Sequence, residues 1–197
     1  MDVVKISKGN TKMGRIWNIS LPPVLTCRND APCARDCYAM KSWRMFENVR
    51  DCWTHNLTLW ETDPGAFESS LLAALSLTSG PRFFRWHVAG DIPDAEYPQM
   101  VVRVAKALPE IKFLIFTKQY ELINKAGFTQ PANLAIIFSA WPGLTMDNPY
   151  NYPVAWMQDG AETRVPDSVI ECPGYCDTCG MCWALPTIGK DIVFHKH

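Results

Sequence analysis

The stretch that decides the fold runs from Arg82 to Thr117 and has the sequence RFFRWHVAGDIPDAEYPQMVVRVAKALPEIKFLIFT. It begins with an apolar run over residues 82–89 and ends with another over 112–117, and both are rich in the aromatic and β-branched side chains of buried strands. Between them, residues 96–108 have the composition of a helix. A strand, a helix and a strand in this order predict a right-handed β-α-β unit with two parallel strands in one sheet.

The same alternation extends in both directions along the chain. Before this stretch, a short strand is predicted over residues 15–20, and helices are predicted to begin near Ala34 and at Asp63-Pro64. About five or six strands are too few for a closed barrel of eight. The sequence therefore predicts an α/β fold, namely a partial, open β/α barrel over residues 1–165 with a Cys-rich tail over 166–197. The later elements are predicted over residues 119–125, 134–140, 152–157 and 192–195.

The composition excludes several classes of protein. Hydrophobic residues make up 48% of the 197 residues and charged residues 20%, which rules out disorder as the main state. The formal net charge is -1, so no basic excess favours general nucleic-acid binding. No apolar run approaches the roughly 20 residues of a membrane span. The N-terminus also lacks the apolar core of a signal peptide, so we expect a soluble protein of the cytoplasm.

The eight cysteines form two groups, and the C-terminal group has the spacing C-x3-C-x2-C-x2-C. Clustered thiols in a reducing cytoplasm indicate a metal site rather than disulfides. Short spacings with a proline beside a ligand, as at Pro173, are typical of iron–sulfur loops, whereas structural zinc sites hold two Cys pairs farther apart. The spacing predicts an iron–sulfur cluster, with zinc or four unligated thiols as the alternatives. The four ligands are Cys172, Cys176, Cys179 and Cys182.

The N-terminal group places Cys27, Cys33 and Cys37 in a loop that leads into a predicted helix. Three thiolates leave one iron of a cubane without a protein ligand, and an open metal position is where a substrate or cofactor binds. Cys52 is the candidate for a fourth ligand. It flanks the apolar stripe of a predicted helix, which favours the alternative of an inert, half-buried thiol.

Polar residues mark the ends of the predicted strands. Strand alternation places Arg85 and His87 on one face, while Asp91 follows the same strand and Lys118 follows the next. Because the chemistry of parallel α/β folds gathers at the carboxyl ends of strands, these four are the candidate catalytic residues. The alternatives are a buried network that only stiffens the sheet, an Asp91 that caps a turn, and a solvated Lys118. Further polar residues follow later strands, at Ser139 and Asp159.

Several motifs together resemble a phage family. They are Lys8-Gly-Asn-Thr-Lys-Met-Gly14, Ser20-Leu-Pro-Pro23, Thr26-Cys27, Cys33-Ala-Arg-Asp-Cys37-Tyr-Ala39, Phe46-Glu-Asn-Val-Arg50 and the tail that ends at Cys182-Trp183. In combination they look like the family called gene product eighty-eight, over most of the chain. The resemblance implies a bacteriophage or prophage origin, and hence the host cytoplasm, without an assigned reaction.

The order of elements is also similar, more remotely, to the radical S-adenosylmethionine (SAM) enzymes, whose partial barrel carries a three-cysteine loop after its first strand. Their usual C-x3-C-x2-C spacing, with an aromatic residue before the third cysteine, is here C-x5-C-x3-C with Tyr38 after it. Their Gly-Gly-Glu-type stretch has Ala89-Gly90-Asp91 as its nearest counterpart. The resemblance implies 4Fe-4S clusters, with SAM as a further candidate cofactor that Tyr38 and Asp91 would contact.

The sequence therefore predicts an iron–sulfur protein with two cysteine sites and redox or radical chemistry at the N-terminal one. The C-terminal cluster would relay electrons or anchor the tail. Two alternatives belong to other classes: a non-catalytic carrier of electrons or clusters, and a zinc-stabilised interaction protein of the phage. The small-molecule substrate or redox partner is left open, as is whether the two cysteine groups share one larger cluster.

Overall fold

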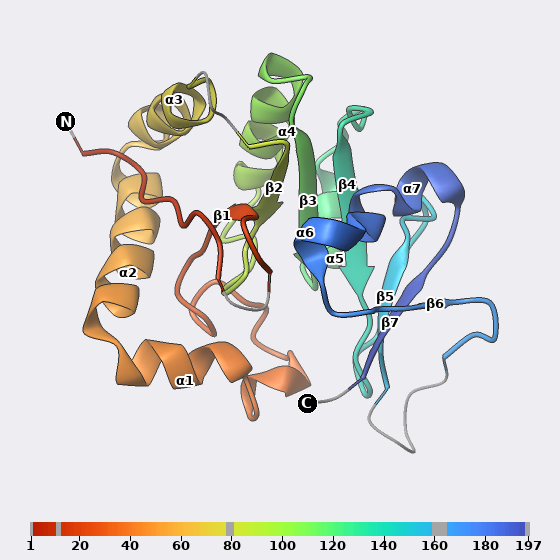
Figure 1. Cartoon of the computed structure of the whole chain (residues 1–197). Coiled ribbons are helices and arrows are strands. Elements are labelled where there is room, and N and C mark those ends of the chain that lie inside the picture. Colours follow the sequence, from red (N-terminus) through yellow and green to blue (C-terminus); the bar gives the residue numbers. More distant parts are fainter. Residues whose placement is uncertain (1, 11–12, 78–80, 159–164, 196–197) are drawn as a thin grey trace.

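The computed structural model describes residues 2–10, 13–77, 81–158 and 165–195. In these residues the centre of the molecule is a seven-stranded sheet with the order β1-β2-β3-β4-β5-β7-β6, and neighbouring strands pair in parallel (Figure 1). The strands are β1 (Trp17–Ile19), β2 (Phe83–Trp86), β3 (Lys112–Thr117), β4 (Leu134–Ser139), β5 (Val154–Gln158), β6 (Ile170–Glu171) and β7 (Ile192–His195).

This sheet confirms the predicted α/β class and the parallel pairing of its strands. The order runs from β1 at one edge to β6 at the other, so the sheet of the described residues is open. Strands β1 to β5 follow one another in chain order, and helices connect β1 to β2, β2 to β3 and β3 to β4. Its curvature into a partial barrel is not shown and stays a prediction.

Seven α-helices and two 3-10 helices connect these strands in the described part of the chain. The start of the third α-helix is where the sequence predicts it, because the Asp63 carboxylate accepts a hydrogen bond from the Ala66 N–H at 2.9 Å and Pro64 occupies the first turn. None of the helices described is both long and apolar enough to cross a bilayer. The helices are α1 (Tyr38–Met45), α2 (Glu47–Thr62), α3 (Pro64–Leu75), α4 (Tyr97–Ala107), α5 (Tyr120–Lys125), α6 (Cys176–Cys179) and α7 (Leu185–Ile188), with 3-10 helices η1 (Pro32–Ala34) and η2 (Met181–Trp183).

One face of the sheet packs against α2, α3 and α4. Phe84 and Trp86 of β2 and Phe113 of β3 are fully buried there, together with Phe67 of α3 and Tyr97 of α4. The aromatic rings meet edge to face, for example Trp86 and Tyr97 at 6.0 Å between ring centres. Burial of such large apolar side chains is the dominant favourable contribution to folding.

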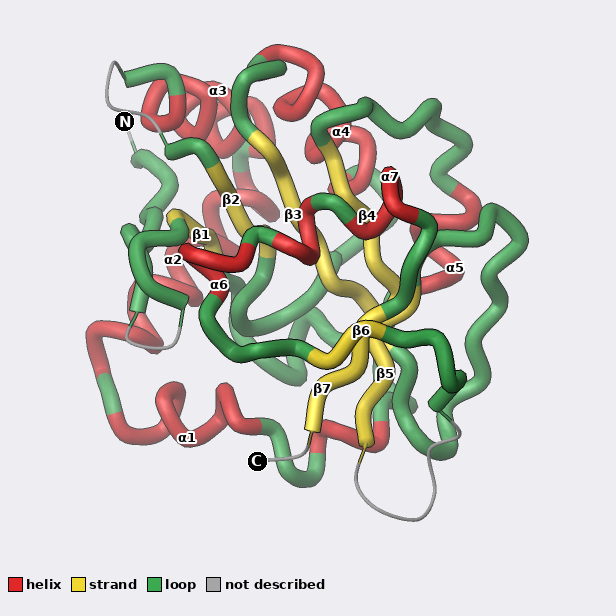
Figure 2. The backbone as a smooth tube through the Cα atoms, turned by 45° about the vertical axis from the view of Figure 1, so that its right-hand side comes forward, coloured by secondary structure: helices red, strands yellow, loops and turns green. Residues whose placement is uncertain are grey.

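The opposite face of the sheet is covered by the Cys-rich tail. Leu114 of β3 and Ile137 of β4 form a second core with Trp183 and Leu185. The indole N–H of Trp183 also donates to the carbonyl of Phe84 at 3.2 Å. Figure 2 shows α6 and α7 crossing in front of β2, β3 and β4. The tail is therefore packed onto the sheet as a layer of its own.

The predicted boundaries agree with the structure for some strands and not for others. β3 and β7 coincide with the predicted ranges 112–117 and 192–195, whereas β2 ends at Trp86, three residues before the predicted end at Ala89. The two-residue β6 and the short helices of the tail were not predicted, because so few residues carry no periodicity. β6 and β7 extend the same sheet beyond β5, and the division of the chain at residue 165 stays a prediction. Asp159 lies outside the described residues.

Candidate functional site

The loop that carries Cys27, Cys33 and Cys37 leaves the carboxyl end of β1 and leads into α1. The three thiols lie close enough to act on one another electrostatically. Burial raises the pKa of Cys27 to about 12, and the nearby Asp91 carboxylate adds to the effect. Burial also raises the pKa of Cys33, whereas the positive charge of the nearby Lys118 ammonium lowers it. The loop thus brings three thiols together at one edge of the sheet, and Cys27 is protonated at neutral pH.

Asp91 joins the loops that follow three neighbouring strands. Its backbone N–H donates to the Thr26 hydroxyl at 2.9 Å, and its carboxylate accepts hydrogen bonds from the Thr117 hydroxyl at 2.6 Å and the Lys118 N–H at 2.8 Å. The Ile92 N–H donates a third at 2.8 Å. Burial raises the pKa of Asp91, and these three hydrogen bonds act in the opposite direction. Because the carboxylate is already occupied, this geometry favours a structural role for Asp91 over a contact with the amine of SAM.

Gly90 allows the close approach of the two loops on which Asp91 depends. Its φ is 76°, and a Cβ at this position would lie 2.7 Å from both the Leu21 carbonyl oxygen and the Thr26 hydroxyl oxygen. A side chain is excluded by both the backbone conformation and the space. The Gly90-Asp91 pair therefore fixes the end of β2 against the start of the cysteine loop.

Lys118 lies at the carboxyl end of β3, beside the last residue of β4. Its Nζ donates to the Ser139 hydroxyl at 2.9 Å and lies 5.3 Å from the centre of the Trp141 ring. Its backbone carbonyl accepts a hydrogen bond from the Arg28 guanidinium at 3.2 Å. Through its backbone N–H it is also bonded to Asp91. Polar residues from the ends of β2, β3 and β4 thus form one connected group next to the cysteine loop.

The structure separates Arg85 from His87. Arg85 points to the face of the sheet that the tail covers, where its guanidinium lies 5.0 Å from the centre of the Phe116 ring. The strand ends at Trp86, and His87 has a left-handed backbone with φ 52°, so its ring turns to the helical face, where Nε2 lies 3.1 Å from the Tyr97 hydroxyl. The prediction that these two residues share a face was wrong, because strand alternation stops where the strand ends.

His87 is a buried, neutral side chain. It is 3% exposed, and burial, with a smaller contribution from the Arg85 charge, lowers its pKa to about 3. Its Nδ1 has no hydrogen-bond partner among the described residues. Its hydrogen-bond partner is Tyr97 of the helical layer, so His87 is placed in the core rather than beside the cysteines.

The four cysteines of the tail line one small pocket, together with Pro173, Tyr175, Gly180, Met181, Trp183 and Ile192. Gly180 has φ 60° and ends α6, so the chain turns back between Cys179 and Cys182. Burial raises the pKa of Cys182 to about 12, Cys172 adds to this, and the Arg85 charge lowers it. The Nε of Arg85 is buried and has no hydrogen-bond partner among the described residues. An incompletely satisfied cation therefore lies close to this group of thiols.

Tyr38 and Cys52 differ in how they relate to the cysteine loop. Tyr38 follows Cys37 directly, and its hydroxyl donates to the Val88 carbonyl, which ties the loop to the end of β2. Cys52 is half-buried on α2, and burial raises its pKa while Lys5 lowers it. These surroundings favour the inert thiol over the fourth ligand.

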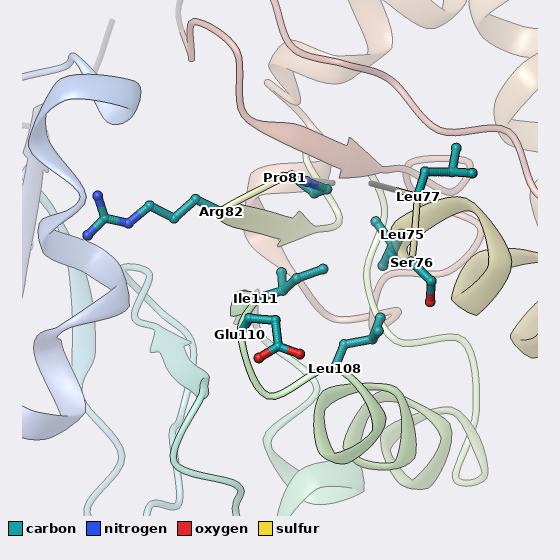
Figure 3. A pocket seen from close by; sticks show the side chains of 8 residues that line it. All are labelled: Leu75, Ser76, Leu77, Pro81, Arg82, Leu108, Glu110 and Ile111. Atoms are coloured by element: carbon teal, nitrogen blue, oxygen red, sulfur yellow. The ribbon is translucent and has the colours of Figure 1, made fainter. Parts of the chain in front are cut away.

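Neither cysteine group is a preformed metal site. In the described part of the chain, no three side chains of His, Cys, Asp or Glu are arranged to hold a metal ion, and all eight cysteines are free thiols. A larger pocket lies elsewhere, where β2 and β3 begin, and contains no thiol (Figure 3). That pocket is therefore at the opposite edge of the sheet from the cysteine loop. It is lined by Leu75, Ser76, Leu77, Pro81, Arg82, Leu108, Glu110 and Ile111.

Two polar residues of the carboxyl edge were missed by sequence reasoning. The Thr26 hydroxyl accepts a hydrogen bond from the Asp91 N–H, 65 residues away in the sequence. The Arg28 guanidinium donates one to the Lys118 carbonyl, 90 residues away. Local periodicity carries no information on partners that are so distant. The available signal was position, because both residues flank Cys27 in a loop that follows a strand.

Comparison with family models identifies the family of the chain. The model described as Gene product 88 matches residues 4–185. The chain belongs to the Gene product 88 family. The part that matches the family contains both cysteine groups and the polar residues of the carboxyl edge, and it ends at Leu185, the first residue of α7. Comparisons with curated proteins and with solved structures found no match, and the similarity to radical SAM enzymes stays a prediction.

Proposed function

We propose that the chain binds iron–sulfur clusters through its two cysteine groups and carries out redox or radical chemistry at the N-terminal one. The observation that carries the proposal is the tail pocket, which four half-buried thiols from one short segment line together. Four thiolates are the usual ligand set of a 4Fe-4S cluster. The reducing host cytoplasm, which the family suggests as the location, would keep these thiols available.

The residues around the tail pocket fit such a cluster. A cluster with four thiolate ligands is an anion, and Arg85 offers a buried guanidinium with an unpartnered Nε within electrostatic range of Cys182. Hydrogen bonds and positive charge near the sulfurs tune the reduction potential of a cluster. Cys172, Cys176, Cys179 and Cys182 would hold the group, which would accept and donate one electron at a time.

Binding would also complete the fold of the tail. Thiols bind metal only as thiolates, so each ligand must lose a proton, and burial opposes that loss at Cys182. The positive charge of the bound metal would offset the mutual repulsion of four thiolates. We therefore expect the ordering of residues 172–183 and the uptake of metal to be linked.

The N-terminal loop is the proposed reactive site. Cys27, Cys33 and Cys37 lie at the carboxyl edge of a parallel sheet, where α/β proteins bind their ligands. Three thiolate ligands would leave one coordination position open next to Lys118. Cys52 is not needed in this arrangement. SAM is a candidate for the open position, in a frame that we propose to be a partial β/α barrel.

Anaerobic metal and sulfide analysis with electron paramagnetic resonance (EPR), with and without SAM, tests the proposal. We expect a brown protein with equal amounts of iron and sulfide and a cluster signal after reduction. A colourless protein that contains zinc would overturn it in favour of a zinc-stabilised interaction protein. A cluster signal that SAM does not change would leave a carrier of electrons or clusters as the function.

A further inference from the structure

Lys118 is a half-buried cation with unused hydrogen-bonding capacity. Its Nζ donates to the Ser139 hydroxyl at 2.9 Å and faces the Trp141 ring, and no ion pair involves it among the described residues. An ammonium group has three N–H donors, so donors are left for a further acceptor. The Asp91 carboxylate is within electrostatic range of Lys118 but forms no ion pair with its ammonium group, so burial of this cation is only partly offset. An anion that binds here would therefore accept hydrogen bonds from the remaining N–H donors of Lys118 and balance its positive charge.

The position of this cation is that of a ligand site. Lys118 follows β3, Ser139 ends β4, and Lys118 lies within electrostatic range of the Cys33 thiol on the loop after β1. Ligands of parallel α/β proteins bind at these carboxyl ends. Arg28 is the neighbouring cation, and its guanidinium is already paired with Asp30 at 2.5 Å. Lys118 is thus a cation that is free to meet a ligand beside the loop.

We infer that Lys118 anchors the carboxylate or phosphate group of the ligand on which the cysteine loop acts. The Ser139 hydroxyl, which accepts from Lys118, is placed to donate to the same anion, and the Trp141 ring forms an apolar wall beside it. The inference rests on the proposed function because it assigns the ligand class of that site. Its test nevertheless uses the metal-free chain, so the two can fail separately.

The test compares two alkylating reagents at Cys33 in the full-length, metal-free, reduced protein. Iodoacetate is an anion and iodoacetamide is neutral, and with either reagent a carbon–sulfur bond forms at the thiolate and iodide leaves. Because both reactions need the same thiolate, the ratio of their rates is independent of the pKa of Cys33. The ratio therefore measures the positive charge that the reagent meets on its approach. Mass spectrometry of the Cys33 peptide gives both rates.

We expect Lys118→Gln to lower the ratio of the iodoacetate rate to the iodoacetamide rate about two- to threefold, the effect of one unit charge at several ångströms in water. Lys118→Arg should preserve the ratio. Lys112→Gln is the matched control, because Lys112 is exposed at the other end of β3. A ratio that is the same in Lys118→Gln and the wild type would overturn the inference. Should the variant not fold, a wild-type ratio that does not fall between low salt and 1 M salt would overturn it as well.

Protection experiments distinguish the two anion chemistries. Inorganic phosphate and acetate are added separately while iodoacetamide reacts with Cys33 in the wild type and in Lys118→Gln. Slower reaction with phosphate alone identifies a phosphate ligand, and slower reaction with acetate alone identifies a carboxylate. Protection that Lys118→Gln retains, or protection by neither anion, contradicts the inference. Iron analysis of the same variants tests the proposed function independently, because Lys118 is not among the proposed ligands of the cluster and its substitution should leave the iron content unchanged.

Discussion

The cysteine loop of residues 27–37 and the Cys-rich tail of residues 172–183 are held in place by different contacts. The loop is fixed by polar contacts: Asp91 bonds to the loops after β1 and β3, and the hydroxyl of Tyr38 bonds to the end of β2. The tail is fixed by apolar packing of Trp183 and Leu185 on the sheet. Cys172 follows β6 directly, and the other three cysteines lie on the short helices α6 and η2, which are too short to be stable by themselves.

This difference predicts which of the two proposed metal sites depends on metal for its fold. A hydrogen-bonded loop at a sheet edge keeps its geometry without a ligand, and so it can offer an open position. The tail is anchored by Trp183, whose ring lies 4.8 Å from that of Phe83, and by the buried Leu185. Under the proposed function, its four thiols would come together only as thiolates around a metal cation. We therefore expect the fold of the tail to depend on metal, whereas the backbone of the loop should keep its conformation without it.

The largest effect is expected from the double substitution Cys176→Ser and Cys179→Ser. It should remove one cluster's worth of iron and loosen residues 172–183, because two remaining thiolates cannot hold a cluster. Iron analysis and hydrogen exchange measure the two effects. Cys52→Ser is the matched control and should keep the full iron content. Unchanged iron in the double variant would contradict the tail assignment.

Removal of a loop ligand should leave the tail intact. We expect Cys37→Ala to lose the iron of the loop while the EPR signal of the tail cluster persists, because the tail cysteines line a separate pocket. Hydrogen exchange in residues 172–183 should stay as in the wild type. Loss of both signals together would show instead that the two groups share one larger cluster.

The polar network is expected to support the loop specifically. Asp91→Ala should lower the free energy of unfolding by about 3 kcal/mol, since it leaves the Thr117 hydroxyl and the Lys118 N–H without their partner in a buried site. It should also speed alkylation of Cys27 more than that of Cys182. Denaturant unfolding and peptide mass spectrometry measure these effects, with the exposed Asp51→Ala as control. Equal acceleration at both cysteines would contradict a role confined to the loop.

The smallest effect concerns His87, which belongs to neither cysteine group. Its pKa is lowered to about 3 in the folded chain, from an ordinary value of 6.5, so the unfolded chain takes up a proton first as the pH falls. Stability should therefore be constant with respect to this group above pH 6.5 and fall by about 1.4 kcal/mol per pH unit below it. His87→Asn, which tolerates the left-handed backbone, should reduce that slope in denaturant unfolding between pH 7.5 and pH 5. A slope identical to the wild type would place His87 in contact with solvent.

Much of the fold follows from local sequence. The apolar runs at 112–117 and 192–195 are strands with those same bounds, and Asp63-Pro64 begins α3 as a capped helix must. Hydrophobic periodicity and capping are properties of neighbouring residues, which is why they can be read directly from the chain. The Cys spacings likewise predict that the thiols of each group lie within reach of one another, and their role as metal ligands stays a prediction.

The assembly of the site depended on contacts between distant residues. The sequence alone determined that thiols are clustered and that polar residues follow the strands. Only the tertiary structure decided that Arg85 faces the tail while His87 turns to the helices, because a single left-handed residue reverses the alternation. It also decided that the tail covers the sheet. Trp183 packs against the Phe83 ring and donates a hydrogen bond to the Phe84 carbonyl, and contacts between residues about 100 positions apart leave no local pattern.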